Sequence, residues 1–192
     1  MLILIVRHGE TDYNKMKRVQ GRLQVPLNEN GKTQALQVAE CLRQYKITHI
    51  YCSGLVRARE TADIINQSFS LPIITDNRLI ERNWGIWQNR DVNEILKQET
   101  ELKFWNEENL DLNPHLGETT RDLMARSADF LNSLIQHHTA SDVILVVTHG
   151  GPMKMMVGII KGLRDEDYLH RQMKNGQILK VKYESSGFLI EQ

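Results

Sequence analysis

The sequence has few of the features that mark specialised classes of protein. Only two cysteines occur in 192 residues, and neither Cys41 nor Cys52 has a second ligand at a metal-binding spacing. Their places, in a helical pattern and at a strand end, predict two buried thiols. The 24 lysines and arginines balance the 24 aspartates and glutamates, and no basic run occurs. This balance argues against a nucleic-acid partner.

Long apolar runs are also missing. The apolar segment of residues 2–6 is much shorter than the core of a signal peptide, and Arg7 follows it at once. No stretch approaches the ~18 apolar residues of a membrane span. We therefore expect a cytoplasmic protein without a membrane partner, built as a single domain over residues 1–192. The oligomeric state stays open, with a homodimer among the alternatives.

Apolar runs and helical periodicities alternate along the chain. The runs are continuous and rich in β-branched residues, as in strands buried on both faces, and lie at 2–6, 47–51, 73–74 and 143–147. Apolar residues at helical spacing lie at 35–42, 55–69, 124–135 and 153–160, the last ending at Gly162. This order predicts an α/β fold with a mostly parallel central sheet.

Three further segments complete the expected organisation. Thr119, with Asp122 three residues later, predicts an N-cap for the third helix. Residues 177–183 and 188–190 flank a Ser-Ser-Gly turn and predict a terminal hairpin. Residues of about 88–116 are polar and carry asparagine-rich turns, so we expect an inserted helical flap over one end of the sheet.

Two of the predicted strands end in the same dipeptide. Residues 4–6 lead to Arg7-His8-Gly9, and residues 146–148 lead to His149-Gly150-Gly151. The carboxyl ends of parallel strands lie at one edge of a sheet, where ligands bind at a topological switch point. The two histidines can therefore face each other. The glycines let the backbone come close to a ligand and offer N–H groups to an anion.

Two arginines belong to the same edge. Arg7 precedes the first histidine, and Arg57 opens the helix that follows the second strand. A guanidinium donates two parallel hydrogen bonds to a phosphate, and helix N-termini add partial positive charge. A neutral imidazole can attack phosphorus while such donors stabilise the charged equatorial oxygens. Glu81, after the third strand, is the best-placed carboxylate to protonate a leaving alkoxide.

These residues resemble the signature of the histidine phosphatase (phosphoglycerate mutase-like) superfamily. The resemblance spans residue 3 to about residue 160 in the family's order, and its first motif is Arg7-His8-Gly9-Glu10-Thr11. It includes Asn14, Gln20-Gly21-Arg22, Pro26-Leu27-Asn28, Gly31, Gln34-Ala35, Ser53-Gly54-Leu55-Val56-Arg57-Ala58, Thr61-Ala62, Glu81 with Gly85 and Trp87, Gly117-Glu118-Thr119 and Thr148-His149-Gly150-Gly151. Five such blocks in order are very specific.

The resemblance implies a three-layer α/β/α fold and a role for each matching residue. His8 would become phosphorylated, while Arg7, Arg57 and His149 hold the phosphoryl group. Asn14 would add a polar contact, and Glu81 would act first as proton donor and then as base for water. Gln20, Gly21 and Gly150 complete the expected phosphate-binding set. The family implies no metal and no cofactor.

The substrate is less determined than the chemistry. Phosphoglycerate mutases resemble this chain at the core, but they carry a longer insertion and usually an acidic residue with glycine where this chain has Gln88-Asn89. A mutase must exclude water from its phosphohistidine, so a shorter covering segment favours hydrolysis of that intermediate. We therefore expect a phosphomonoesterase acting on a small phosphorylated metabolite, similar to α-ribazole phosphatases or broad-specificity phosphatases. A phosphoglycerate mutase is the alternative.

Two further functions compete with this prediction. One is a metal-dependent hydrolase with His8 and His149 as ligands, which the adjacent arginines disfavour because they would repel a divalent cation. The other is a non-catalytic phosphate-binding module.

Several single residues also have ordinary structural explanations. Glu81 could simply pair with Arg82, and Glu118 could favour a helix N-terminus. The pair His137-His138 is expected at the surface, and the three tryptophans, Trp84, Trp87 and Trp105, are expected mainly to pack.

Overall fold

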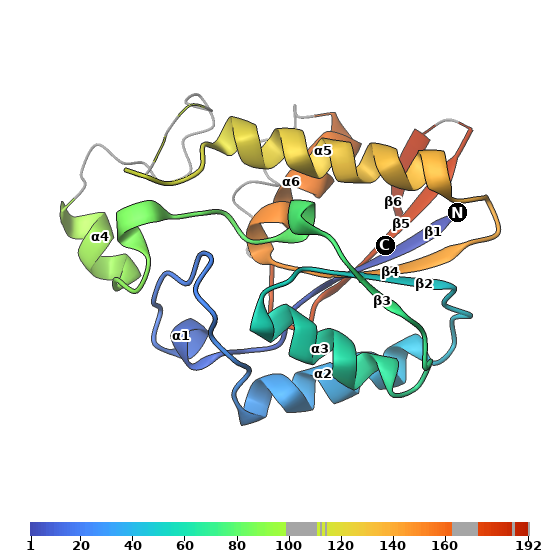
Figure 1. The fold of residues 1–192 in the computed structure, drawn as a ribbon, viewed down its shortest axis with the longest axis horizontal. Coiled ribbons are helices and arrows are strands. Elements are labelled where there is room, and N and C mark those ends of the chain that lie inside the picture. The colour runs from blue at the N-terminus through green and yellow to red at the C-terminus, as the bar shows by residue number, and fades with distance from the viewer. Residues whose placement is uncertain (99–110, 112, 114, 163–172, 186, 192) are drawn as a thin grey trace.

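The computed structural model describes residues 1–98, 111, 113, 115–162, 173–185 and 187–191 (Figure 1). The strands of this part are β1 (Leu2–Arg7), β2 (His49–Cys52), β3 (Ile73–Thr75), β4 (Val143–Thr148), β5 (Ile178–Glu184) and β6 (Gly187–Glu191). The helices are α1 (Asp12–Lys15), α2 (Glu29–Leu42), α3 (Val56–Asn66), α4 (Val92–Gln98), α5 (Thr120–His137) and α6 (Gly150–Lys161). Two short 3-10 helices span Asn77–Leu79 and Gly85–Trp87.

The strands form one sheet in the order β3-β2-β4-β1-β5-β6. The first four strands in this order are parallel, and β5 and β6 add an antiparallel edge. β1 lies directly beside β4, with Arg7 opposite Thr148. The residues that follow these two positions, His8 and His149, therefore leave the sheet side by side.

Helices cover both faces of the sheet, as Figure 1 shows with α5 and α6 on one side and α2 and α3 on the other. Alternate residues of β1 point to the two layers: Ile3 and Ile5 pack with α5 and α6, while Leu4 and Val6 pack with α2 and α3. This alternation explains why the strand is apolar without interruption. The predicted α/β/α architecture with a mostly parallel sheet is confirmed.

The predicted helix ends and the terminal hairpin are confirmed. Thr119 and Asp122 form a capping box at the start of α5. Gly162 ends α6 in the left-handed conformation, with φ of +81°. β5 and β6 pair antiparallel across the predicted turn. About half of the expected flap at 88–116, residues 99–110, 112 and 114, lies outside the described residues. Its described start contains α4.

Three burial predictions are wrong. β3 is an edge strand whose Ile74 is 42% exposed, because β2 covers only one of its sides. Cys41 is exposed, since the buried stripe of α2 passes through Leu42 and leaves its neighbour outside. His138 has a side chain only 4% exposed. There the chain turns from α5 back toward β4, which places the ring against Tyr51.

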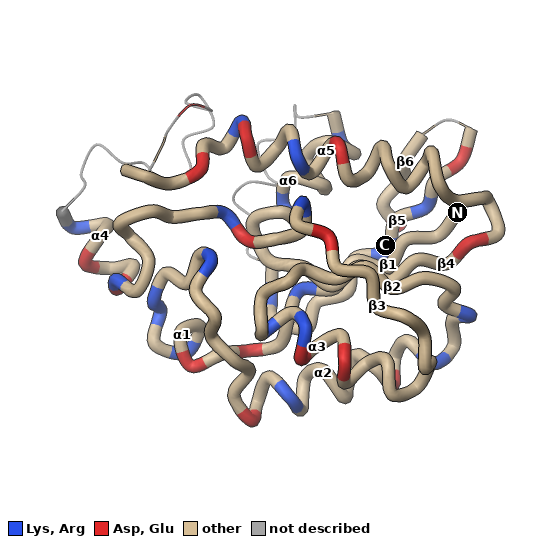
Figure 2. The backbone as a smooth tube through the Cα atoms, viewed as in Figure 1, with Lys and Arg blue, Asp and Glu red and all other residues tan. Residues whose placement is uncertain are grey.

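Charge is distributed evenly along the fold. Figure 2 shows acidic and basic residues interspersed along the helices and loops. Among the described residues, no helix combines the length and apolarity needed to cross a bilayer.

Candidate active site

His8 and His149 meet at the carboxyl edge of the sheet. Their ring centroids are 5.1 Å apart, and the two rings are tilted by 57°. Both residues are buried, at 2% and 0% exposure. The backbone N–H of His8 donates to the carbonyl of Thr148 at 3.0 Å, which extends the β1–β4 ladder into the site. The predicted convergence of the two His-Gly segments is therefore present.

The hydrogen bonds of His8 select one tautomer. Nδ1 lies 2.6 Å from the carbonyl oxygen of Gly9, which can only accept, so Nδ1 carries the proton. Nε2 then has a lone pair, toward which Arg57 Nε donates at 3.2 Å. Burial, followed by the charges of Arg57 and Arg7, holds the pKa of His8 well below its ordinary value. The ring is therefore a neutral imidazole whose Nε2 lone pair accepts a hydrogen bond from a guanidinium.

Arg57 is buried and fixed by the loop that follows α1. Its two terminal nitrogens donate to the carbonyls of Gly21 at 2.7 Å and Leu23 at 2.9 Å. Gly21 has a φ of +52°, and a Cβ there would lie 2.1 Å from Gln88 Oε1. Burial lowers the pKa of Arg57 to about 10, so the guanidinium stays charged at neutral pH. Its orientation toward His8 is thus set before any ligand binds.

Arg7 supplies the second guanidinium. Its Nη1 donates to the carbonyl of Met173, while its buried Nε has no hydrogen-bond partner among the described residues. Burial lowers its pKa, an effect that the charge of Glu81 opposes. An unpartnered buried N–H is costly. An anion at this position would satisfy it.

His149 lies behind His8 and is oriented by Ser53. Its Nε2 is 2.7 Å from Ser53 Oγ, and that oxygen also accepts from the N–H of Leu55 at 3.3 Å. Its buried Nδ1 has no hydrogen-bond partner within the described part of the chain. Burial and then the charge of Arg57 hold its pKa well below the ordinary value. The sequence pattern included Ser53 but gave no sign that it contacts the second histidine.

Glu81 reaches the N-terminus of α6. Its Oε1 accepts from the backbone N–H of Arg82 at 2.8 Å and from that of Gly151 at 3.2 Å. A Cβ on Gly151 would lie 2.3 Å from this oxygen, so the glycine is what permits the approach. The side chains of Glu81 and Arg82, both among the described residues, do not form the ion pair that the sequence allows; the Glu81 carboxylate accepts from the backbone N–H of Arg82. Arg82 Nε donates to the carbonyl of Glu118, and its guanidinium stacks over Trp84.

These residues surround a cavity of about 310 Å³. Of the predicted site residues, all but His149 line it: Arg7, His8, Asn14, Gln20, Gly21, Arg57, Glu81 and Gly150. Asn14 Oδ1 accepts from Thr11 and Asn175, and no described residue donates a hydrogen bond to the buried Gln20 Oε1. The described residues that line the cavity include four cationic side chains, those of Arg7, Arg18, Arg57 and Lys154, and one carboxylate, that of Glu81. The lining therefore favours an anion.

Several lining or supporting residues were missed by sequence reasoning. Lys154 lies one turn into α6 and lines the cavity with Arg18. Asn175 holds the loop after β1, donating to the carbonyls of His8 at 3.0 Å and Gly9 at 3.2 Å. An Asn-Gly pair signals a turn, but nothing local places that turn beside His8.

The tryptophans divide between packing and lining. Trp87 is 2% exposed and packs with Ile95, as expected. Trp84 also lines the cavity, together with Val19, Val92 and Leu96. Trp105 lies outside the described residues. Glu118 is not a simple helix-end charge: its carboxylate pairs with Arg126 at 2.6 Å and Arg22 at 3.4 Å.

The surroundings of the two central histidines do not suit a divalent cation. Arg57 donates to the nitrogen of His8 that a metal would need, and Ser53 occupies Nε2 of His149. Two guanidinium charges lie beside them. This arrangement disfavours the metal-dependent hydrolase alternative on electrostatic grounds.

Comparison with known proteins identifies the family. The profile of the histidine phosphatase superfamily (branch 1) matches residues 3–192. The chain belongs to this superfamily. Among curated relatives, the "Probable phosphoglycerate mutase GpmB" of Escherichia coli O1:K1 / APEC is 34% identical over 198 residues, covering 98% of this chain and 90% of the relative. The protein of the same name from Cronobacter sakazakii is 32% identical over 191 residues, covering 97% and 87%.

Solved structures of superfamily members have the same fold. "Mycobacterial hydrolase 1" superposes with a TM-score of 0.90 at 28% identity, over 100% of this chain and 96% of that one. A mycobacterial glucosyl-3-phosphoglycerate phosphatase, solved with VO3, gives 0.88 at 28% identity over 99% and 96%. Membership in this superfamily makes the protein an enzyme that acts on phosphate monoesters.

Proposed function

We propose that this histidine phosphatase hydrolyses a small phosphorylated metabolite through a phosphohistidine on His8. The observation that carries the proposal is the state of the His8 ring. Its proton is fixed on Nδ1 by Gly9, which leaves the Nε2 lone pair beside Arg57 in an anion-binding cavity. A neutral imidazole held in this tautomer can act as a nucleophile toward phosphorus.

In the first step Nε2 of His8 attacks phosphorus. A P–N bond forms while the bond from phosphorus to the ester oxygen breaks. Arg57, Arg7 and the ring of His149 would stabilise the charge on the equatorial oxygens. Ser53 donating to Nε2 of His149 would leave a proton on Nδ1 for one of these oxygens. A protonated Glu81 would give its proton to the leaving alkoxide.

In the second step water attacks the phosphohistidine. Glu81, now ionised, accepts a proton from the water as the new P–O bond forms and the P–N bond breaks. His8 returns to its starting state, and inorganic phosphate leaves. The backbone N–H groups of Arg82 and Gly151 hold the carboxylate in place for both proton transfers.

The cavity also limits the substrate. Its volume of about 310 Å³ suits a small molecule. The buried phosphate-binding residues His8 and Arg57 line it together with more exposed apolar residues, the half-buried Val19, Trp84 and Val92 and the exposed Leu96. A small phosphomonoester with an apolar or ring-shaped organic part fits this division. The phosphatase neighbour that acts on a glucosyl phosphoglycerate supports an organic phosphate of this kind.

A phosphoglycerate mutase is the second candidate, favoured by the names of the curated relatives. It would share the first step and differ only in the acceptor of the phosphoryl group. In place of the acidic residue expected of mutases, Gln88 packs over Gly21 and accepts from the N–H of Arg22 at 2.7 Å. This contact holds the loop around Gly21 and Arg22. It leaves Gln88 without a carboxylate to retain a phosphoryl acceptor other than water, and this favours hydrolysis.

The decisive experiment is to trap the intermediate. Enzyme is quenched during turnover of a ³²P-labelled phosphomonoester, and label that is acid-labile and base-stable is mapped by peptide analysis. We expect the label on His8 and none in the His8→Ala variant, whose fold is checked by circular dichroism. A folded wild-type enzyme that releases phosphate without such label would overturn the mechanism. No turnover on a panel of phosphorylated metabolites would favour the non-catalytic module.

The same panel separates the two enzymatic candidates. Release of inorganic phosphate is measured beside conversion of 3-phosphoglycerate to 2-phosphoglycerate. We expect phosphate release to dominate. Isomerisation faster than phosphate release would make the chain a mutase.

A further inference from the structure

A second pair of histidines lies at the opposite, amino edge of the sheet. His49 begins β2, and His138 follows the last residue of α5. Their ring centroids are 4.5 Å apart in an edge-to-face arrangement. Asp142, just before β4, lies between them. The mechanism proposed above uses none of these three residues.

The distances in this cluster are those between ligands of one ion. Asp142 Oδ1 is 3.8 Å from His49 Nδ1, and Asp142 Oδ2 is 3.8 Å from His138 Nδ1. Both distances are too long for hydrogen bonds. Two ligand atoms bound at ~2.1 Å to a tetrahedral metal lie roughly 3.4 Å apart. Small side-chain movements would therefore allow one donor atom from each of the three residues to bind the same ion. Donor atoms of the three residues lie within 4.8 Å of one another.

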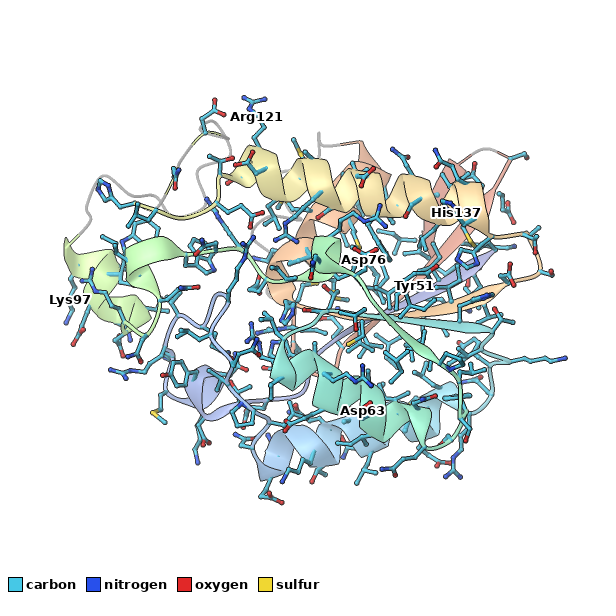
Figure 3. All side chains as sticks on the ribbon, viewed as in Figure 1. Tyr51, Asp63, Asp76, Lys97, Arg121 and His137 are labelled. Carbon is cyan, nitrogen blue, oxygen red and sulfur yellow. The ribbon has the colours of Figure 1, made fainter. Side chains whose placement is uncertain are left out.

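The surroundings of His138 suit such a site. Its Nε2 is 2.9 Å from the hydroxyl of Tyr51, so a metal on Nδ1 would leave an Nε2–H to donate to that hydroxyl. A partner of this kind orients a ligating imidazole and fixes its tautomer. The side chain of His138 is only 4% exposed and that of Asp142 18%, whereas His49 is 39% exposed and opens the cluster to solvent. Figure 3 shows Tyr51 on the sheet and, at the end of α5, His137, the residue before His138.

The charge of the cluster also favours a cation. Asp142 is the carboxylate shared by both rings. His49 Nδ1 contacts Thr48 Oγ1 at 2.9 Å, and Asp142 accepts from the N–H of Thr139 at 2.7 Å. On metal binding, His49 Nδ1 would exchange its contact with Thr48 for the ion, while Asp142 would keep the hydrogen bond from Thr139.

We propose that His49, His138 and Asp142 form a binding site for a divalent transition-metal ion. Two imidazoles and one carboxylate are ligands that Zn²⁺ accepts, with water in the fourth position. The ion would join the end of α5 to the starts of β2 and β4. It would stabilise the fold at the edge far from the phosphate cavity and take no part in catalysis.

The test is calorimetric titration of chelator-treated enzyme with Zn²⁺, paired with thermal unfolding. We expect one ion per chain and a Tm that rises with Zn²⁺ concentration. His49→Asn removes the most exposed ligand and should weaken binding more than ~10-fold, since even second-shell partners of metal ligands contribute 10–100-fold. Asp142→Asn should do the same, and both variants should keep the phosphatase activity of the wild type.

Two further variants make the result specific. His137→Gln removes the adjacent exposed histidine outside the cluster and should bind Zn²⁺ like the wild type. His8→Ala tests whether zinc binds in the phosphate cavity instead. The proposal is overturned if wild-type enzyme binds no Zn²⁺ at up to ~100 μM, if His49→Asn and Asp142→Asn both bind normally, or if His8→Ala abolishes binding.

Discussion

The two histidine pairs of this protein show how neighbours decide what an imidazole pair can bind. His8 and His149 have ring centroids 5.1 Å apart, and those of His49 and His138 are 4.5 Å apart. The first pair lies among guanidinium groups and helix N-termini, so its cavity favours an anion. The second pair shares a carboxylate and has a phenol behind it, a combination that suits a cation.

Position in the sheet explains this difference. At the carboxyl ends of parallel strands the chain enters helices, so backbone N–H groups and positive helix dipoles gather there. At the amino ends the chain leaves helices and turns. Asp142 there accepts from Thr139 and closes the turn into β4. The chemistry of each edge therefore follows from the direction in which the strands run.

Removing the proton donor at the carboxyl edge should have the largest effect of the substitutions below. Glu81→Gln keeps the shape of the side chain but cannot cycle a proton. We expect kcat/KM to fall ~10²–10⁴-fold for esters with poor leaving groups and much less for nitrophenyl phosphates. Steady-state kinetics on both classes measure this. Equal losses on both would mean that Glu81 is not the acid.

Altering the guanidinium beside His8 should have the next largest effect. Arg57→Lys keeps the charge but loses the planar fork that contacts Gly21, Leu23 and the ring. We expect kcat/KM to fall at least ~100-fold. Arg59→Lys is the matched control, because Arg59 lies on the exposed side of the same helix and pairs with Asp63. Similar rates for the two variants would contradict the assigned role.

Releasing the second histidine from its hydroxyl partner should have a smaller effect. Ser53→Ala leaves His149 Nε2 without a contact, so the ring can take the other tautomer and present a lone pair to the phosphoryl oxygens. We expect kcat to fall roughly 10-fold, about the loss of one hydrogen bond to a buried group. Ser53→Thr, which keeps the hydroxyl, should recover most of the rate. Failure of threonine to exceed alanine would indicate a packing role.

The pH dependence of stability should show the mildest difference. In the folded state His8 and His149 have pKa values well below 6.5, so the unfolded chain binds protons more readily. Their contribution to stability is complete above pH 6.5 and is lost as pH falls below it, by up to about 1.4 kcal/mol per pH unit for each ring. Urea unfolding between pH 7.5 and 5 measures this slope.

A substitution of His8, at the carboxyl edge of the sheet, is the control for this dependence of stability on pH. His8→Gln removes one titrating ring and should make the decline with acid shallower. A slope that stays the same would mean that His8 binds its proton as readily in the folded protein as in the unfolded chain.

Local sequence patterns predict much of the fold. Continuous apolar runs predicted strands covered on both faces, and β1 and β4 are such strands. The capping pair Thr119 and Asp122 and the terminal Gly162 set the ends of α5 and α6 as expected. The exposure of Ile74 and Cys41 was mispredicted, because apolar character alone does not say which strand is last in the sheet or which side of a helix faces it.

The amino-acid sequence by itself determined the two His-Gly strand ends, the arginines beside them and the shared edge on which they fall. These follow from residue type and from the rule that parallel strands end together. Only the tertiary structure decided that Ser53 orients His149, that Asn175 holds the loop of His8, and that His49, His138 and Asp142 meet. Such contacts depend on which strands lie side by side and how helices pack, and no local pattern encodes either.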